Sequence, residues 1–214
     1  MNWSPAEYDR ACRDYDRKWA VLDQALYGLC KRCPNHRRRD WLNAKLWIVG
    51  RAYATGIERK VPSEGRQGEA MSKVADHLWR HRRRLDGFIR RLSQIRQPLS
   101  PGKLRTVLAV HGQFVALLEP KMTRGQSPRS FASKYLHFHC PAVPLYDTFA
   151  LRALTNLYPL NRCGRAFVLP LRADEEYGRY VLRFWWLYQD ARKRGRRVTV
   201  KLLDYYLLCV AEEL

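Results

Sequence analysis

The sequence predicts an all-α protein, a compact bundle of about eight helices, from three observations. Helix-initiating residues recur along the chain, apolar side chains repeat behind them at helical spacing, and alternating strand patterns are nearly absent. The only short strand candidate, residues 166–169, is cut by Pro170. A length of 214 residues fits one domain, and 46% hydrophobic residues are enough for a sizeable core.

Three helices are expected in an N-terminal region, residues 1–99. Ser4 is a good N-cap and Pro5 suits the first helical position, so the first helix should cover residues 5–29. Asp40 should cap the second, which runs to about residue 57. A glycine-punctuated connection then leads to a third helix over residues 69–96, whose outer face is dense in arginine.

Five more helices are expected in residues 100–214, either as a second region or as part of one continuous two-lobed domain. The seventh, residues 174–194, begins with acidic residues and ends with basic ones, as the helix dipole favours. The five expected starts are Ser100, Ser127, Asp147, Asp174 and Thr199.

Net charge indicates a polyanionic partner. The chain carries 40 Lys and Arg against 20 Asp and Glu, a formal charge of +20, and the excess is concentrated between residues 31 and 172. Thirty of the 40 cations are arginine, whose planar fork binds phosphate and stacks on bases, so a nucleic acid is the expected partner. A basic surface that meets an acidic protein is the alternative.

No apolar stretch approaches the ~20 residues of a membrane span, and the first 22 residues carry four carboxylates where a secretory signal would be apolar. We therefore expect no membrane partner and a cytoplasmic location. The six cysteines are expected to be reduced thiols. Cys30, Cys33 and His36 have zinc-like spacing without an evident fourth ligand, so no metal is expected.

Residues 121–154 carry the most chemistry. At 100° per residue, aromatic side chains form a buried helix face, which is bordered by a polar stripe of Ser130, Lys134 and His137. A lysine beside apolar surface can lose its proton through desolvation, the condition for a Schiff base. Alternatively, Lys134 snorkels, with its stem on the aromatic residues and its amine in solvent or on phosphate.

A stiff turn follows, because Pro141 and Pro144 end the helix. Asp147 comes next at a helix start, where backbone N–H groups favour its ionised form. It is either an ordinary helix cap or a catalytic carboxylate.

The order of these features resembles a known family. Gly125-Gln-Ser-Pro-Arg-Ser-Phe-Ala, a helix, a proline-rich break and Val143-Pro-Leu-Tyr-Asp147-Thr follow one another. This order resembles the helix–hairpin–helix DNA glycosylase superfamily, in which the catalytic aspartate follows a hairpin, a helix and a proline-containing loop. Ala132-Ser-Lys-Tyr-Leu-His-Phe is similar to a bacterial group with the 8-oxoguanine glycosylase fold.

The chain also departs from that family. Ser127 stands in place of the second hairpin glycine, and Arg129 stands where bifunctional members carry the Schiff-base lysine. Arginine stays protonated and cannot be an amine nucleophile. Three alternatives follow. The nucleophile is Lys134, it is Lys121 from before the hairpin, or the enzyme is monofunctional and needs no amine. The four-cysteine signature of some relatives is missing, so no iron–sulfur cluster or other cofactor is expected.

The resemblance implies a monomeric DNA glycosylase, with or without AP lyase activity, that flips a damaged or modified base out of double-stranded DNA. Asp147 and Lys134 would be catalytic. The expected DNA-binding residues are Gly125, Ser127, Arg129, Arg80, Arg82, Arg83 and Arg84. The expected base-pocket residues are His137, Trp185, Trp186, Tyr205 and Tyr206, although the apolar helices that carry the aromatic ones favour a core position for them. A non-catalytic nucleic-acid-binding protein on the same fold is the main alternative.

Overall fold

The computed structural model describes residues 3–66, 68–164 and 166–214, and over these residues the chain is all-helical with no strand. The N-terminal part contains α1 (Pro5–Lys18), α2 (Ala20–Arg32), α3 (Arg39–Trp47), a π-helical turn η1 (Ile48–Ala52), α4 (Ile57–Lys60), α5 (Glu69–Arg80) and α6 (Arg82–Leu92). The remainder contains α7 (Pro101–Leu118), η2 (Glu119–Lys121), α8 (Arg129–His139), α9 (Thr148–Leu157), η3 (Leu160–Arg162), α10 (Glu175–Lys193) and α11 (Val200–Glu212). The all-α prediction is confirmed.

Most predicted helix starts are confirmed by their caps. The side chains of five N-cap residues accept a hydrogen bond from a backbone N–H of the first turn; these residues are Ser4, Ser100, Asp147, Asp174 and Thr199. Asp40 is not a cap, because α3 begins one residue earlier and Asp40 lies in its first turn, paired with Arg38. At α8 the N-cap is Pro128, and the hydroxyl of Ser127 accepts the amide of Arg129 at 3.3 Å.

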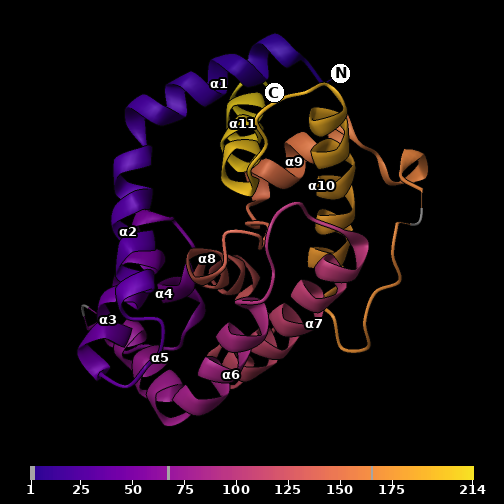
Figure 1. Ribbon diagram of the computed structural model, residues 1–214. Helices are drawn as coiled ribbons and strands as arrows, with labels where there is room; N and C mark the ends of the chain where they lie inside the picture. Colours follow the sequence, from indigo (N-terminus) through magenta and orange to yellow (C-terminus); the bar gives the residue numbers. More distant parts are fainter. Residues whose placement is uncertain (1–2, 67, 165) are drawn as a thin grey trace.

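The expected number of about eight helices is too low, since the described residues form eleven α-helices. Two expected helices are each broken at one residue: Trp19 separates α1 from α2, and His81 separates α5 from α6. The chain changes direction at both breaks and so wraps around the rest of the molecule (Figure 1). The short α4 adds one more helix, which begins at Ile57, the expected end of the second helix.

Helix α8 lies in the middle of the molecule (Figure 1) and packs against α2, α6, α7 and η1. Every residue from Phe131 to Phe138 is buried, including the polar ones. Helix α11 packs on α1 and α9, so helices from residues 1–99 and from 100–214 contribute to the same buried cluster. None of the described helices has the length and apolar character needed to cross a membrane.

Candidate functional site

The turn between α8 and α9 is held from both sides. Three hydrogen bonds fix it: His137 Nδ1 donates to the Val143 carbonyl at 2.7 Å, the Tyr177 hydroxyl to the Pro144 carbonyl at 2.6 Å, and the Tyr146 amide to the Ser133 hydroxyl at 2.9 Å. Two of these anchors lie on α8 and the third on α10. The position of Asp147, the next residue, is therefore set by the core of the protein.

Asp147 and Lys134 form an ion pair across this turn. Lys134 Nζ lies 2.8 Å from Asp147 Oδ2 and also donates to the Tyr53 carbonyl at 2.8 Å. The other carboxylate oxygen, Oδ1, accepts the Phe149 amide at 3.0 Å and caps α9. The lysine side chain is 6% exposed and the aspartate side chain 18%. Lys134 therefore does not snorkel to solvent, and the carboxylate is the more accessible partner.

A cleft of about 440 Å³ opens beside this pair, and we call it the acid-lined cleft. Its walls come from α1, α2, α8, α11 and the segment around Tyr53. Five carboxylates and three amines line it: Asp14, Asp23, Asp147, Asp204 and Glu212, with Lys18, Lys134 and Lys201. The cleft is within the ~300–1,000 Å³ range of small-molecule sites.

A buried charge network forms one wall of the acid-lined cleft. Lys201 Nζ lies 3.1 Å from Asp204 Oδ2 and 3.6 Å from Asp23 Oδ2. Asp23 also accepts hydrogen bonds from the hydroxyls of Tyr15, at 2.6 Å, and Tyr53. The Oδ1 atom of Asp204 has no hydrogen-bond partner among the described residues. Burial raises the pKa of Asp204, although the charge of Lys201 opposes the shift.

A second cleft, of about 570 Å³, opens on the other side of Asp147, and we call it the hairpin cleft. It is lined by the loop between η2 and α8, by the start of α9 and by residues 54–60. Lys60 ties the loop to α4, because its amine donates to the Ser127 carbonyl at 2.8 Å and its carbonyl accepts the Thr123 amide at 2.7 Å. Gly125 turns the loop with a φ of +79°. Asp147 lines both clefts.

Arg129 lines the hairpin cleft, but its charge is already used within the protein. Its Nε lies 2.6 Å from Asp174 Oδ1 and its Nη1 2.8 Å from Glu176 Oε2. The guanidinium also lies over the ring of Tyr146, 5.3 Å from the centroid. A phosphate would have to displace two carboxylates, so the expectation that Arg129 binds DNA does not fit this geometry. The exposed Arg59 lines the same cleft.

Several predicted residues lie away from both clefts. Lys121 is in η2, which packs against α5 and α7, and it lines neither cleft. The same holds for the arginines around the α5–α6 break: Arg80, Arg82, Arg83 and Arg84. Arg82 lies over the Trp79 ring at 4.5 Å, while Arg83 and Arg84 are exposed. These arginines form a basic surface that is separate from the Lys134–Asp147 pair.

The predicted base-pocket residues do not come together. His137 is fully buried and holds the turn; burial and the charge of Lys201 lower its pKa to about 3, so it is neutral at pH 7. Trp185 and Trp186 line neither cleft. Tyr205 does line the acid-lined cleft, and its hydroxyl donates to Asp14.

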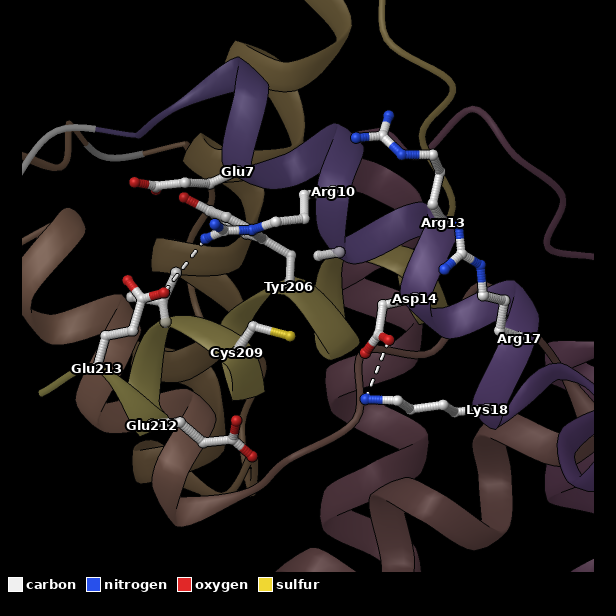
Figure 2. Close-up of a pocket in the computed structure, with 12 residues that line it drawn as sticks. Glu7, Arg10, Arg13, Asp14, Arg17, Lys18, Tyr206, Cys209, Glu212 and Glu213 are labelled. Carbon is white, nitrogen blue, oxygen red and sulfur yellow. Dashed lines mark hydrogen bonds and ion pairs between the residues drawn. The ribbon is translucent and has the colours of Figure 1, made fainter.

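Tyr206 belongs to the core, with its ring edge-on to Tyr8 and 1% of its surface exposed. It also reaches a third hollow, of about 410 Å³, between α1 and α11. Figure 2 shows that hollow, with Tyr206 and Cys209 from α11 facing charged side chains of α1. Arg10 pairs there with Glu213, and Lys18 with Asp14.

The zinc-like spacing near the N-terminus does not build a metal site. No group of three His, Cys, Asp or Glu side chains among the described residues could hold a metal ion. His36 instead lies 2.6 Å from Asp86 Oδ1 and 2.7 Å from the Tyr135 hydroxyl.

The sequence reasoning missed the residues that complete the acid-lined cleft, chiefly Trp19, Asp23, Lys201 and Asp204. One signal was available for two of them. Lys201 and Asp204 stand three residues apart in a helix that carries no other charged residue before Glu212, and buried charged side chains must be paired or must face a cavity. Trp19 and Asp23 carried no such signal. No family model, curated protein or solved structure matches the chain.

Proposed function

We propose that the protein is a DNA glycosylase with AP lyase activity, which excises a damaged or modified base from double-stranded DNA. The observation that carries the proposal is the 2.8 Å pair of Lys134 and Asp147 at the boundary of two clefts. An amine and a carboxylate in contact are the groups needed to attack C1′ and to move a proton. The overall charge of +20 suits a DNA backbone.

In this mechanism the ammonium of Lys134 gives a proton to Asp147 Oδ2. The neutral amine attacks C1′ of the sugar as the N-glycosidic bond breaks, and the leaving base takes the bonding electron pair and the proton from Asp147. Asp147 then takes a proton from Nζ and passes it to O4′ as the C1′–O4′ bond breaks and the sugar ring opens, which gives a protonated imine between Nζ and C1′. Asp147, ionised again, takes a C2′ proton, and the C3′–O bond breaks with its electron pair going to the 3′ phosphate, which cleaves the strand.

The two clefts suggest how a nucleotide would be held. Arg59 and Lys60 beside the hairpin loop supply cations for the backbone, next to the loop amides. The acid-lined cleft is large enough for a flipped base, and both clefts reach Asp147. The reacting sugar would then lie at Asp147, with the backbone on one side and the base on the other.

The test is borohydride trapping on a duplex with an abasic site, because its C1′ aldehyde forms the imine whichever base the enzyme excises. We expect a covalent adduct with the natural protein, lost by at least about 100-fold in Lys134→Met. Lys121→Met is the matched control and should trap normally, since Lys121 lines neither cleft. Asp147→Asn should slow trapping and base release by about 100-fold.

Two results would overturn parts of this proposal. Base release from lesion-bearing duplexes without any trapping would leave a monofunctional glycosylase that uses Asp147 to activate water. No adduct and no base release on any duplex would overturn the enzymatic proposal.

A non-catalytic nucleic-acid-binding protein is the second candidate. It is favoured by the two hydrogen bonds that already hold the Lys134 amine, one to Asp147 and one to the Tyr53 carbonyl. This candidate predicts duplex binding that Asp147→Asn leaves unchanged, with no abasic product. The glycosylase proposal also allows binding by that variant, so the product assay decides between the two.

A further inference from the structure

The acid-lined cleft is negatively charged, although the protein as a whole is positively charged. The chain carries +20 and 30 arginines, yet among the described residues the cleft is lined by five carboxylates, three amines and no arginine. Three ion pairs, Lys18–Asp14, Lys134–Asp147 and Lys201–Asp204, use all three amines. Lys201 also lies 3.6 Å from Asp23, so it is shared between two carboxylates. Five carboxylates against three amines leave two negative charges in excess, so the cleft repels phosphate and attracts a cation.

One acceptor in this cleft is buried and unused. Asp204 is 3% exposed, and its Oδ1 atom has no hydrogen-bond partner within the described part of the chain. An unsatisfied buried carboxylate oxygen costs free energy, and a ligand that donates an N–H bond would recover it. Asp204 is one of the residues that line the cleft, so a ligand in the cleft lies next to this side chain.

The third observation is an aromatic wall. Trp19 lies at the break between α1 and α2 and is 41% exposed, unlike most large apolar side chains of the protein. Tyr53 and Tyr205 line the same cleft. Aromatic faces bind flat rings, and they bind cationic rings best, because the ring face carries negative charge.

We propose that the acid-lined cleft receives a cationic heteroaromatic ring that donates N–H bonds, which in nucleic acid is an N-alkylated purine. Trp19 stacks on the ring, Asp204 Oδ1 accepts one of its N–H groups, and the excess carboxylates balance its charge. For its DNA context this inference rests on the proposed glycosylase function, in which the flipped base enters this cleft. A neutral oxidised purine would leave the excess carboxylates without a counter-charge.

The inference is tested by calorimetric binding of nucleosides to the intact protein, which needs no catalysis. The probes are 1-methyladenosine, whose base is cationic at pH 7, and adenosine as its neutral partner. We expect 1-methyladenosine to bind at least about tenfold more tightly, the difference one favourable charge contact gives. Equal or weaker binding of 1-methyladenosine would overturn the inference.

Two variants locate the binding. Trp19→Ala removes an exposed side chain, so the fold should persist, and it should weaken 1-methyladenosine binding by about tenfold. Trp186→Ala, on a tryptophan outside the cleft, is the control and should bind normally. Asp204→Asn should reduce the preference for 1-methyladenosine over adenosine. Unchanged binding in Trp19→Ala would overturn the inference even if Asp204→Asn failed to fold.

Base-release assays separate this inference from the proposed function. Duplexes that carry N7-methylguanine or 8-oxoguanine provide a cationic and a neutral lesion. Preferred binding of 1-methyladenosine without base release from either duplex would support the inference and count against the glycosylase. Release of 8-oxoguanine together with equal binding of the two nucleosides would overturn the inference and leave the glycosylase intact.

Discussion

Three buried histidines are held in their neutral form. His36 and His111 have their pKa lowered to about 4 and His137 to about 3, and in each case burial is the largest cause. Each ring is also used in a hydrogen bond: His36 with Asp86, His111 with the Arg129 carbonyl and His137 with the Val143 carbonyl. These side chains hold helices and turns in place, and they are poor candidates for proton transfer at neutral pH.

Stability should therefore fall in mild acid. The unfolded chain takes up a proton on each histidine below about pH 6.5, whereas the folded protein resists protonation down to about pH 4. The stabilising contribution is present above the unfolded pKa and is lost as pH falls toward the folded one. Urea unfolding at about pH 7.5 and about pH 5.5 should show a loss of about 1 kcal/mol for each histidine.

The raised pKa of Asp204 acts in the opposite direction, because this group stabilises the fold only at low pH, and it is one group against three. The variant His137→Gln should reduce the pH dependence, since it removes one titrating ring. A free energy of unfolding that stays constant over this pH range would contradict the assignment of neutral histidines.

At the scale of elements, helix starts could be predicted and helix breaks could not. Ser100 and Thr199 mark their helices because a side-chain oxygen before an apolar repeat is a local chemical signal. Trp19 and His81 interrupt helices without glycine or proline, and both breaks follow the packing of the flanking helices around the core. Tertiary packing of this kind leaves no local pattern in the sequence.

The candidate site, too, could be predicted only in part from the sequence. Lys134 and Asp147 could be predicted together because they lie within one short segment, with the turn between them marked by prolines. Asp23 and Asp204 come from α2 and α11, which meet the segment only in the folded chain. The arginines of α5 and α6 lie away from both clefts for a related reason, since their density on one helix face says nothing about their distance from the site.

The two partners of the ion pair between α8 and α9, Lys134 and Asp147, should contribute unequally to stability. Asp147→Ala removes the cap of α9 and leaves the amine of Lys134 buried without a counter-ion, so we expect a loss of about 3–5 kcal/mol. Lys134→Met replaces the amine by an apolar group of similar length and leaves a carboxylate that reaches the cleft, so the loss should be about 1 kcal/mol. Urea denaturation of both variants measures this difference. Equal losses of stability would contradict the claim that the buried Lys134 amine needs Asp147 as its counter-ion.

For the whole molecule, the positive charge is divided between separate surfaces. Arg59 lines the hairpin cleft, whereas Arg84 lies on α6, away from both clefts. Both side chains are exposed, and neither forms an ion pair within residues 3–66, 68–164 and 166–214. They therefore form a matched pair for locating the DNA backbone.

The salt dependence of duplex binding should distinguish these two surfaces. If the backbone lies in the hairpin cleft, Arg59→Ala should lower the slope of log affinity against log salt by about 0.9, the effect of one lost phosphate contact. Arg84→Ala should leave the slope unchanged. Fluorescence anisotropy with a labelled duplex over a salt series measures both slopes, and the reverse result would place the DNA on the α5–α6 surface.

The place of Asp147, shared between the hairpin cleft and the acid-lined cleft, has one more consequence. Arg59 and Lys60 lie on one side of this carboxylate, and the excess carboxylates of the acid-lined cleft lie on the other. The electrostatic potential therefore changes sign across Asp147. Under the proposed function, a nucleotide whose phosphates point toward Arg59 would be attracted, whereas the same nucleotide in the reverse orientation would be repelled at its phosphates. This difference in potential would orient the ligand before any close contact forms.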